Sequence, residues 1–265
     1  NGKEVVPDNQ RVGYNIAHNL ADTTYDEWHR QGTMVKTDDE LFNASLECCL
    51  RDLFILRQPT AKGMGIAAGI PWYTTIFGRD SVITAWQMLP FLPLLAKDTV
   101  DVLGKYQGLR EDTQGKTEEQ VGRIMHELRF GELGRTRTIP FSPYYGTVDA
   151  TQLWILLICE YIKWTGDLDF AHKLWPKLKS AITWINNHSP NGYLIYGDIP
   201  DPEVENQGWK DSHDSVVFAD GRLAKRPIAL CEAQAYIYAA KLELAKLADL
   251  LSHKNYASRL RIEAQ

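Results

Sequence analysis

Three segments of this sequence place aromatic, arginine and aspartate side chains close together, and each precedes a helix that we expect to be buried. The segments are residues 69–81, 143–151 and 206–215. A pyranose ring has apolar faces and a rim of hydroxyl groups. It therefore binds to an aromatic ring on one face and to charged, bidentate hydrogen-bonding groups around its edge. The composition of the three segments indicates this kind of chemistry.

Two kinds of substrate contact are predicted from these segments. Aromatic rings would pack against the apolar face of the sugar, and the predicted rings are those of Trp72, Tyr145 and Trp209. Charged side chains would bind pairs of hydroxyl groups, and the predicted ones are Arg79, Asp80 and Asp149. An aspartate at the start of a helix is also favoured in its ionised form, which only accepts hydrogen bonds.

Hydrolysis of a glycosidic bond needs two carboxyl groups, one to protonate the leaving oxygen and one to activate water or attack the sugar. Asp211 is the predicted general acid, because the indole of Trp209 would lower the polarity around it and raise its pKa. Asp214 is the nearest alternative. Glu127 is a further acidic candidate, predicted to bind substrate. No catalytic base is assigned.

Each candidate also has a simpler structural interpretation. Taken alone, Arg79 and Asp80 fit a salt-bridged helix cap better than a binding site. Asp149 fits a cap and a ligand contact about equally well, and Asp211 lies in an acidic segment that could be solvated loop. That segment lacks the alternating aspartates and glycine of a calcium-binding loop, and the histidines form no cluster. We therefore predict no metal site.

The hydrophobic periodicity predicts an almost all-α chain. Helices are expected at residues 37–58, 80–96, 98–109, 149–164, 169–188, 227–251 and from 254 onward, and Pro90 and Pro93 are expected to bend or end the second of these. A short helix or turn is expected around residues 120–129, weak helical character over 11–28, and the stretch 63–69 is rich in glycine. The helices that begin near Asp80, Asp149 and Pro227 are expected to be buried, and another helix separates each pair. This predicts a barrel of helical hairpins, in which the inner helices all begin at one end.

Four motifs, in their order along the chain, resemble those of bacterial amylo-α-1,6-glucosidase-type proteins of the glucoamylase-like superfamily. They read Gly-Ile-Pro-Trp-Tyr, His-Glu-Leu-Arg-Phe-Gly-Glu, Pro-Tyr-Tyr-Gly-Thr-Val-Asp-Ala-Thr and Gly-Trp-Lys-Asp-Ser. In such enzymes the Arg-Asp pair, here Arg79 and Asp80, holds the non-reducing glucose, and a Trp-x-Asp segment, here ending at Asp211, carries the general acid.

The resemblance implies an (α/α)6 barrel, an inverting mechanism, and neither metal nor organic cofactor. The barrel needs six hairpins, whereas the expected helices supply about three and a half. We therefore expect residues 1–36 to be a connector from a preceding domain and residues 37–265 to be the N-terminal portion of the catalytic domain. Both ends are expected to have been cut from a longer chain, with the base beyond Gln265.

The charge, the apolar runs and the cysteines of the sequence indicate which kinds of binding partner and which compartment to expect. The net charge is −5 and basic residues form no stripe, which argues against a nucleic-acid partner. The sequence contains no run of about 18 apolar residues, so no membrane span is predicted. The four cysteines lie in apolar stretches and are expected to be reduced, which favours the cytoplasm. A neutral carbohydrate is the predicted partner.

The sequence thus predicts a glycoside hydrolase acting on α-glucosidic bonds, of the glycogen-debranching type. One alternative on the same barrel is a hydrolase of a small α-glucoside such as sucrose, trehalose or a glucosylglycerate-like compound. Another is a carbohydrate-binding protein without catalysis. A helical interaction scaffold is a third, but no consensus repeat is present to favour it.

Overall fold

The computed structural model describes residues 13–114, 116–136, 138–139, 141–197 and 204–265. The chain divides into two compact units, Asn1–Ile55 and Leu56–Gln265. Across the described residues, no helix is both long and apolar enough to cross a membrane.

The first unit is a pair of helices, α1 (Tyr14–His29) and α2 (Glu40–Ile55). An aromatic cluster joins them, in which the rings of Tyr25 and Trp28 lie 5.3 and 5.5 Å from that of Phe54. The Tyr25 hydroxyl also donates to Glu47 at 2.7 Å. The predicted connector, residues 1–36, overlaps this unit. Its first twelve residues lie outside the described part, and its role as a connector stays a prediction.

The second unit begins with a small antiparallel sheet, which corrects the expectation of an almost all-α chain. Its order is β1 (Arg57–Thr60), β2 (Gly63–Gly69), β3 (Tyr73–Phe77) and β4 (Glu127–Leu128). The glycine-rich stretch at residues 63–69, for which no strand was predicted, forms β2. Gly65 has a packing role there, because a Cβ atom at this position would lie 2.3 Å from the Ile76 side chain of β3.

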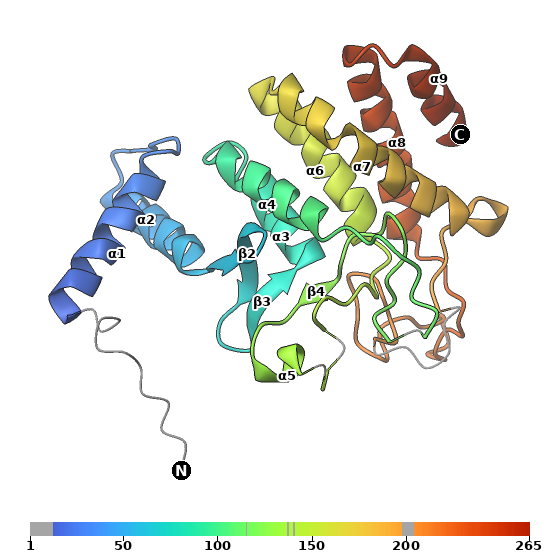
Figure 1. The fold of residues 1–265 in the computed structure, drawn as a ribbon, viewed down its shortest axis with the longest axis horizontal. Helices are drawn as coiled ribbons and strands as arrows, with labels where there is room; N and C mark the ends of the chain where they lie inside the picture. The colour runs from blue at the N-terminus through green and yellow to red at the C-terminus, as the bar shows by residue number, and fades with distance from the viewer. Residues whose placement is uncertain (1–12, 115, 137, 140, 198–203) are drawn as a thin grey trace. The chain divides into compact units, whose positions relative to one another are not determined.

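Three helical hairpins follow the sheet and make up most of the second unit (Figure 1). Their first helices are α3 (Gly78–Gln87), α6 (Ala150–Thr165) and α8 (Cys231–Leu250), and their second helices are α4 (Pro93–Lys105), α7 (Leu168–Asn187) and α9 (Lys254–Glu263). The first helices form a row in which α6 packs between α3 and α8. This row agrees with the predicted hairpin plan, and the complete barrel stays a prediction.

Three expected helix boundaries differ from the structure. The helix expected over residues 80–96 ends at Gln87, and Pro93 begins a new helix because proline fits the first turn, where its missing N–H is not needed. The short helix or turn expected around residues 120–129 is a turn, within a loop that ends in β4, and the short helix α5 (Glu132–Arg135) follows. The last inner helix begins at Cys231 rather than Pro227.

Helix α6 is the centre of the core, as its nearly uniform apolar sequence predicts. It contacts α3, α4, α7 and α8, and almost every side chain from Ala150 to Ile162 is buried. The Trp154 indole is fully buried and donates to the Val100 carbonyl of α4 at 3.1 Å. Trp175 and Trp184 of α7 are also buried, whereas Trp164 at the end of α6 is exposed.

The loops that carry the candidate residues gather where α6 and α8 begin. In Figure 1 the described loop residues before β4 (106–114 and 116–126) and before α8 (204–230) lie together below the first turns of these two helices. A backbone hydrogen bond from Val148 to the Gln207 carbonyl, 2.8 Å long, joins the two loops directly. The side of the fold on which helix N-termini meet is therefore also the side on which the loops meet.

Candidate functional site

The first turn of α3 positions Arg79 at this end of the fold. Strand β3 runs into α3 without a loop, and the Gly78 amide donates to the His126 carbonyl at 2.8 Å. A Cβ atom at position 78 would lie 2.1 Å from the Met125 carbonyl oxygen, so the close approach of the two backbones requires glycine there. The side chain of Arg79 is consequently held beside the loop that precedes α6.

Arg79 forms a buried ion pair with Asp149. Its Nη1 atom lies 3.0 Å from Oδ2 and 3.2 Å from Oδ1 of the carboxylate, and the two side chains are 5% and 1% exposed. Thr147 donates its hydroxyl to the same carboxylate at 2.8 Å. Burial raises the pKa of Asp149, while Arg79 and the Thr147 hydrogen bond oppose that rise.

Asp149 occupies the N-cap position of α6 but does not act as a side-chain cap. Its carboxylate accepts no hydrogen bond from the first turn of that helix. Its partners are Arg79 from α3 and Thr147 from the preceding loop. Of the two interpretations that the sequence left open, the simple cap is therefore the one that the geometry disfavours.

The loop before α8 brings Asp211 and Trp209 to the other side of Arg79. The Nη2 atom of Arg79 lies 3.4 Å from Oδ2 of Asp211, and its guanidinium carbon lies 5.3 Å from the centre of the Trp209 indole. Asp211 is 52% exposed and Trp209 is 54% exposed. The expected apolar surroundings of Asp211 are therefore not present here, and its nearest charged partner is an arginine.

Asp80 completes the group from the first turn of α3. Its carboxyl is largely buried, and this burial raises its pKa; the neighbouring Arg79 opposes the rise and the negative charge of Asp211 adds to it. The three aspartates from the three segments therefore lie around one arginine. We call Arg79, Asp80, Asp149, Trp209 and Asp211 the Arg79 cluster.

The other predicted site residues form no hydrogen bond or ion pair with the Arg79 cluster among the described contacts. Trp72 is 81% exposed, in the turn between β2 and β3, at the opposite end of β3 from α3. Tyr145 is buried, and its hydroxyl donates to the Tyr106 carbonyl at 2.7 Å. The alternative acid, Asp214, is exposed. Neither aromatic residue forms a hydrogen bond with the cluster, so their roles as sugar platforms stay predictions.

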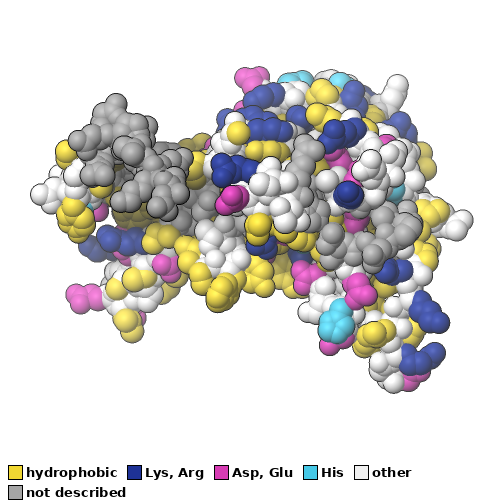
Figure 2. All heavy atoms as spheres, turned by 60° about the horizontal axis from the view of Figure 1, so that its bottom comes forward, with side chains coloured by type: hydrophobic (Ala, Val, Ile, Leu, Met, Phe, Trp, Pro, Cys, Tyr) yellow, Lys and Arg dark blue, Asp and Glu magenta, His cyan; other side chains and the backbone are white. Residues whose placement is uncertain are grey.

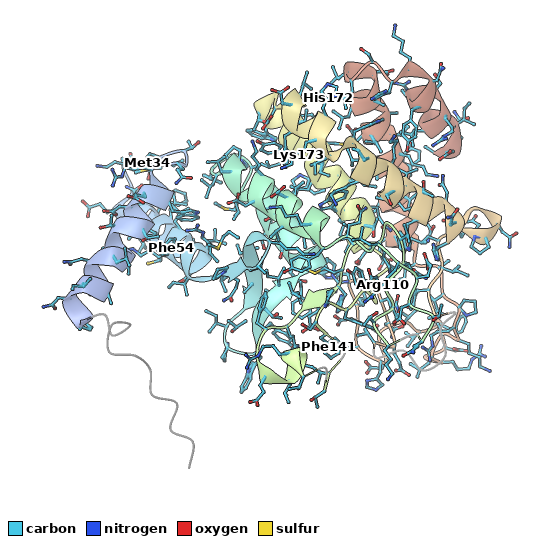
Figure 3. All side chains as sticks on the ribbon, in the orientation of Figure 1. Met34, Phe54, Arg110, Phe141, His172 and Lys173 are labelled. Carbon is cyan, nitrogen blue, oxygen red and sulfur yellow. The ribbon has the colours of Figure 1, made fainter. Side chains whose placement is uncertain are left out.

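Glu127 lies in β4, opposite Phe77 in the register of the sheet. Burial raises the pKa of its carboxyl, and an ion pair with Arg129 opposes the rise. The guanidinium of Arg129 lies over the ring of Phe141, which Figure 3 labels next to α5. Glu127 thus has a protein partner already, and its predicted contact with substrate stays untested.

The structure also brings in Tyr236, which sequence reasoning missed, and it shows the surroundings of His126. Tyr236 lies in the second turn of α8, and its pKa is raised by burial and by the negative charge of Asp149. His126 is buried among Phe77, Tyr144 and the β3–α3 junction, and burial lowers its pKa to about 3. Helical periodicity marks Tyr236 only as one more apolar position, so no local signal could have identified it.

The arrangement can bind a neutral ligand that carries several hydroxyl groups. It offers an exposed indole face, a guanidinium and three carboxyl groups within one cluster, and two of these carboxyls have a raised pKa. Among the described residues, no three His, Cys, Asp or Glu side chains are placed to hold a metal ion. The face turned forward in Figure 2 mixes hydrophobic, acidic and basic side chains, with no single sign of charge dominating it.

No protein-family profile matches the chain, and no curated protein is similar to it in sequence. Among solved structures, a GH78 family rhamnosidase of Bacillus sp. GL1 has a similar fold, with a TM-score of 0.53 and 14% sequence identity. The likeness covers 88% of this chain and 20% of that enzyme, so the chain spans about a fifth of its length. At this identity the comparison shows a fold of the kind found in glycosidases and does not support the debranching type in particular.

Proposed function

We propose that this chain forms part of the active site of a glycoside hydrolase. The observation that carries the proposal is the Arg79 cluster, in which Asp149, Asp211 and the Trp209 indole surround one guanidinium, with Asp80 next to Arg79 in the first turn of α3. A salt-bridged cap would need only one of these aspartates. The similar fold of a rhamnosidase supports the same class of reaction.

In this proposal the buried and the exposed halves of the cluster have different tasks. Arg79 and Asp149 are held rigidly by their mutual ion pair and by Thr147, so they suit the binding of sugar hydroxyls in a fixed geometry. Asp211 is exposed and reaches Arg79 only at 3.4 Å. A sugar entering beside Trp209 would compete for this contact and release the Asp211 carboxyl to act as the general acid.

For the substrate we propose an α-glucosidic linkage, with a glucan branch point cleaved by inversion. This rests on the four motifs that resemble amylo-α-1,6-glucosidases, because the geometry of the cluster is compatible with several sugars. A small α-glucoside is the alternative substrate. The catalytic base is not assigned to any residue of the chain.

The test uses the natural protein that contains this chain, and it measures hydrolysis of panose, isomaltose, maltose, sucrose and trehalose by the release of free glucose. The general-acid role predicts that Asp211→Asn lowers kcat by about 10²- to 10⁴-fold. Asp220→Asn is the matched control, since it makes the same change at an exposed aspartate nine residues away that pairs with Arg222. It should retain the activity of the unmodified protein.

Two results separate the alternatives. If Asp211→Asn is as active as the control, Asp211 is not the acid. If none of the sugars is cleaved but calorimetry detects binding of one of them, and Trp209→Ala abolishes that binding, the protein is a carbohydrate-binding protein without catalysis. A protein that neither cleaves nor binds any of them would remove the proposal altogether.

A further inference from the structure

A second buried polar cluster lies beside the Arg79 cluster and is built from different residues. At its centre is Glu118, a fully buried carboxylate at the positive φ of 52°. Its Oε1 atom accepts from the Tyr144 hydroxyl at 2.7 Å, and its Oε2 atom accepts from the Gln207 amide at 2.8 Å. Burial of the hydroxyl and the nearby negative charge of Glu118 raise the pKa of Tyr144.

Arg123 is the cation of this cluster and is also buried. It lies 3.5 Å from the Glu118 carboxylate and donates to the Gln207 side-chain oxygen at 2.7 Å. Its Nε and Nη2 atoms both donate to the Thr147 carbonyl, at 3.2 and 3.0 Å. The ring of Trp184, from α7, lies 5.3 Å from the guanidinium. The cluster therefore joins three loops that lie far apart in the sequence.

One arm of this cluster leads to Asp149. The Thr147 residue that accepts from Arg123 through its carbonyl also donates its hydroxyl to the Asp149 carboxylate. Between these two residues, the Val148 amide donates to the Gln207 carbonyl at 2.8 Å. The position of Asp149 is thus fixed by the contacts of Thr147 and Val148, the two residues that precede it.

The other arm leads to Trp209 and Asp211. Gln207 lies two residues before Trp209, and its side chain bonds to both Glu118 and Arg123. The side chain of the preceding Asn206 donates to the Ser212 carbonyl at 2.7 Å, which closes residues 206–212 into one loop. A shift of Gln207 is therefore passed to the whole loop.

We propose that Glu118, Arg123 and Gln207 are positioning residues, which set the loop of Trp209 and Asp211 against the loop of Asp149. The inference rests on the proposed function, because it assigns these residues a role in assembling that site. Both loops are irregular, so they have no helical or sheet hydrogen bonds to fix their mutual placement. A buried network of charge-assisted hydrogen bonds can supply that placement, because its partners have few alternative positions.

The test perturbs the network at the point farthest in sequence from Trp209. Glu118→Gln keeps the shape of the side chain but leaves only one oxygen to accept from Tyr144 and Gln207. Glu119→Gln is the matched control, because this neighbouring carboxylate pairs with Arg110, which Figure 3 labels, and forms no bond with Gln207. The chain is labelled with 5-fluorotryptophan, and the ¹⁹F resonance of Trp209 is assigned from its loss in Trp209→Phe.

We expect Glu118→Gln to shift or broaden the Trp209 resonance and to leave that of Trp175, which packs against α9, unchanged. In hydrolysis assays it should lower kcat about tenfold or more with a smaller rise in KM. We expect KM to change less than kcat because Glu118→Gln leaves in place the hydrogen bonds from Arg123 to the Thr147 carbonyl, which hold the loop of Asp149. Should Glu118→Gln not fold, Tyr144→Phe tests the same step, since it removes only the hydroxyl that donates to Glu118.

The inference is overturned if the Trp209 resonance of the folded variant matches that of the Glu119→Gln control. It is also overturned if the protein is active and Glu118→Gln leaves kcat unaltered. If the unmodified protein cleaves no sugar, the proposed function fails on its own, and the Trp209 resonance still decides whether the network positions this loop.

Discussion

Removing the charge of Arg79 should destabilise the protein strongly, because it leaves Asp149 as a buried and unpaired carboxylate. At an N–O distance of 3.0 Å the attraction amounts to ~5 kcal/mol for an effective dielectric constant of about 20. Desolvation of both groups offsets part of that energy in the intact pair. Breaking a buried pair from one side nevertheless costs about 3–5 kcal/mol, since the remaining charge stays desolvated. We expect this loss for Arg79→Met at neutral pH.

The dependence on pH identifies the cause. Burial already raises the pKa of Asp149 above its value in the unfolded chain, and loss of Arg79 would raise it further. A carboxyl with a raised pKa in the folded state destabilises the protein as the pH rises through the interval between the two pKa values. The difference between Arg79→Met and the unmodified protein should therefore shrink as the pH falls toward about 4, near the ordinary pKa of aspartate.

Urea unfolding at several pH values measures these differences, and Arg261→Met is the matched control. Arg261 pairs with Asp249, but both side chains are largely exposed, and such pairs contribute about 0–1 kcal/mol. The double variant Arg79→Met/Asp149→Asn should regain much of the lost stability, since the unpaired charge is gone. A loss for Arg79→Met no larger than that of the control, or one independent of pH, would refute the reasoning.

Three further outcomes follow from individual side chains. His126 is buried and its pKa is lowered to about 3, so the unfolded chain binds a proton at this residue more tightly than the folded chain does. The free energy of unfolding should therefore fall as the pH drops from about 6.5 toward about 3. In urea unfolding, His126→Phe should reduce this dependence on pH, and an unchanged dependence would contradict the assignment. Cys159 is buried and its thiol pKa is raised, so it should react with a thiol reagent only after unfolding. The exposed Cys48 and Cys231 should react in the folded protein. Rapid reaction of all four thiols in the folded protein would contradict the packing of α6. Trp209→Ala should weaken the binding of a sugar, measured by calorimetry. It should leave the free energy of unfolding in urea unchanged, because the indole is more than half exposed. Equal sugar affinity of the variant and the unmodified protein would contradict this prediction.

Helices that depend on a continuous apolar pattern were predictable from the sequence. The prediction for residues 149–164 matches α6 within a residue at each end, and that for residues 169–188 matches α7 equally well. In α7 the hydrophobic residues recur at helical spacing and Asp167 caps the first turn, accepting from the Phe170 amide at 3.1 Å. In these segments local propensity and burial favour the same structure.

The sheet could not be predicted in the same way, because its strands depend on partners distant in sequence. Glycines at 63, 65 and 69 are unfavourable for a strand by propensity, but β2 tolerates them because β3 packs directly on the space above Gly65. Strand β4 is only two residues long and pairs with β3 across about fifty residues of chain. A pattern within one window contains no information on either contact.

The residue types of the candidate site could also be predicted from the sequence, whereas their surroundings could not. The sequence indicated the residue types, because Arg79, Asp80, Asp149, Trp209 and Asp211 stand at helix starts and in polar loops with aromatic neighbours. It misjudged the environment of Asp211, because proximity to Trp209 in sequence does not imply burial, and in the fold that loop turns both side chains toward solvent. It also gave no sign of Glu118, whose importance comes from Tyr144 and Gln207, 26 and 89 residues further along. Chemistry that a single segment carries can therefore be read locally, whereas the placement of that chemistry depends on long-range polar contacts, which only the folded chain contains.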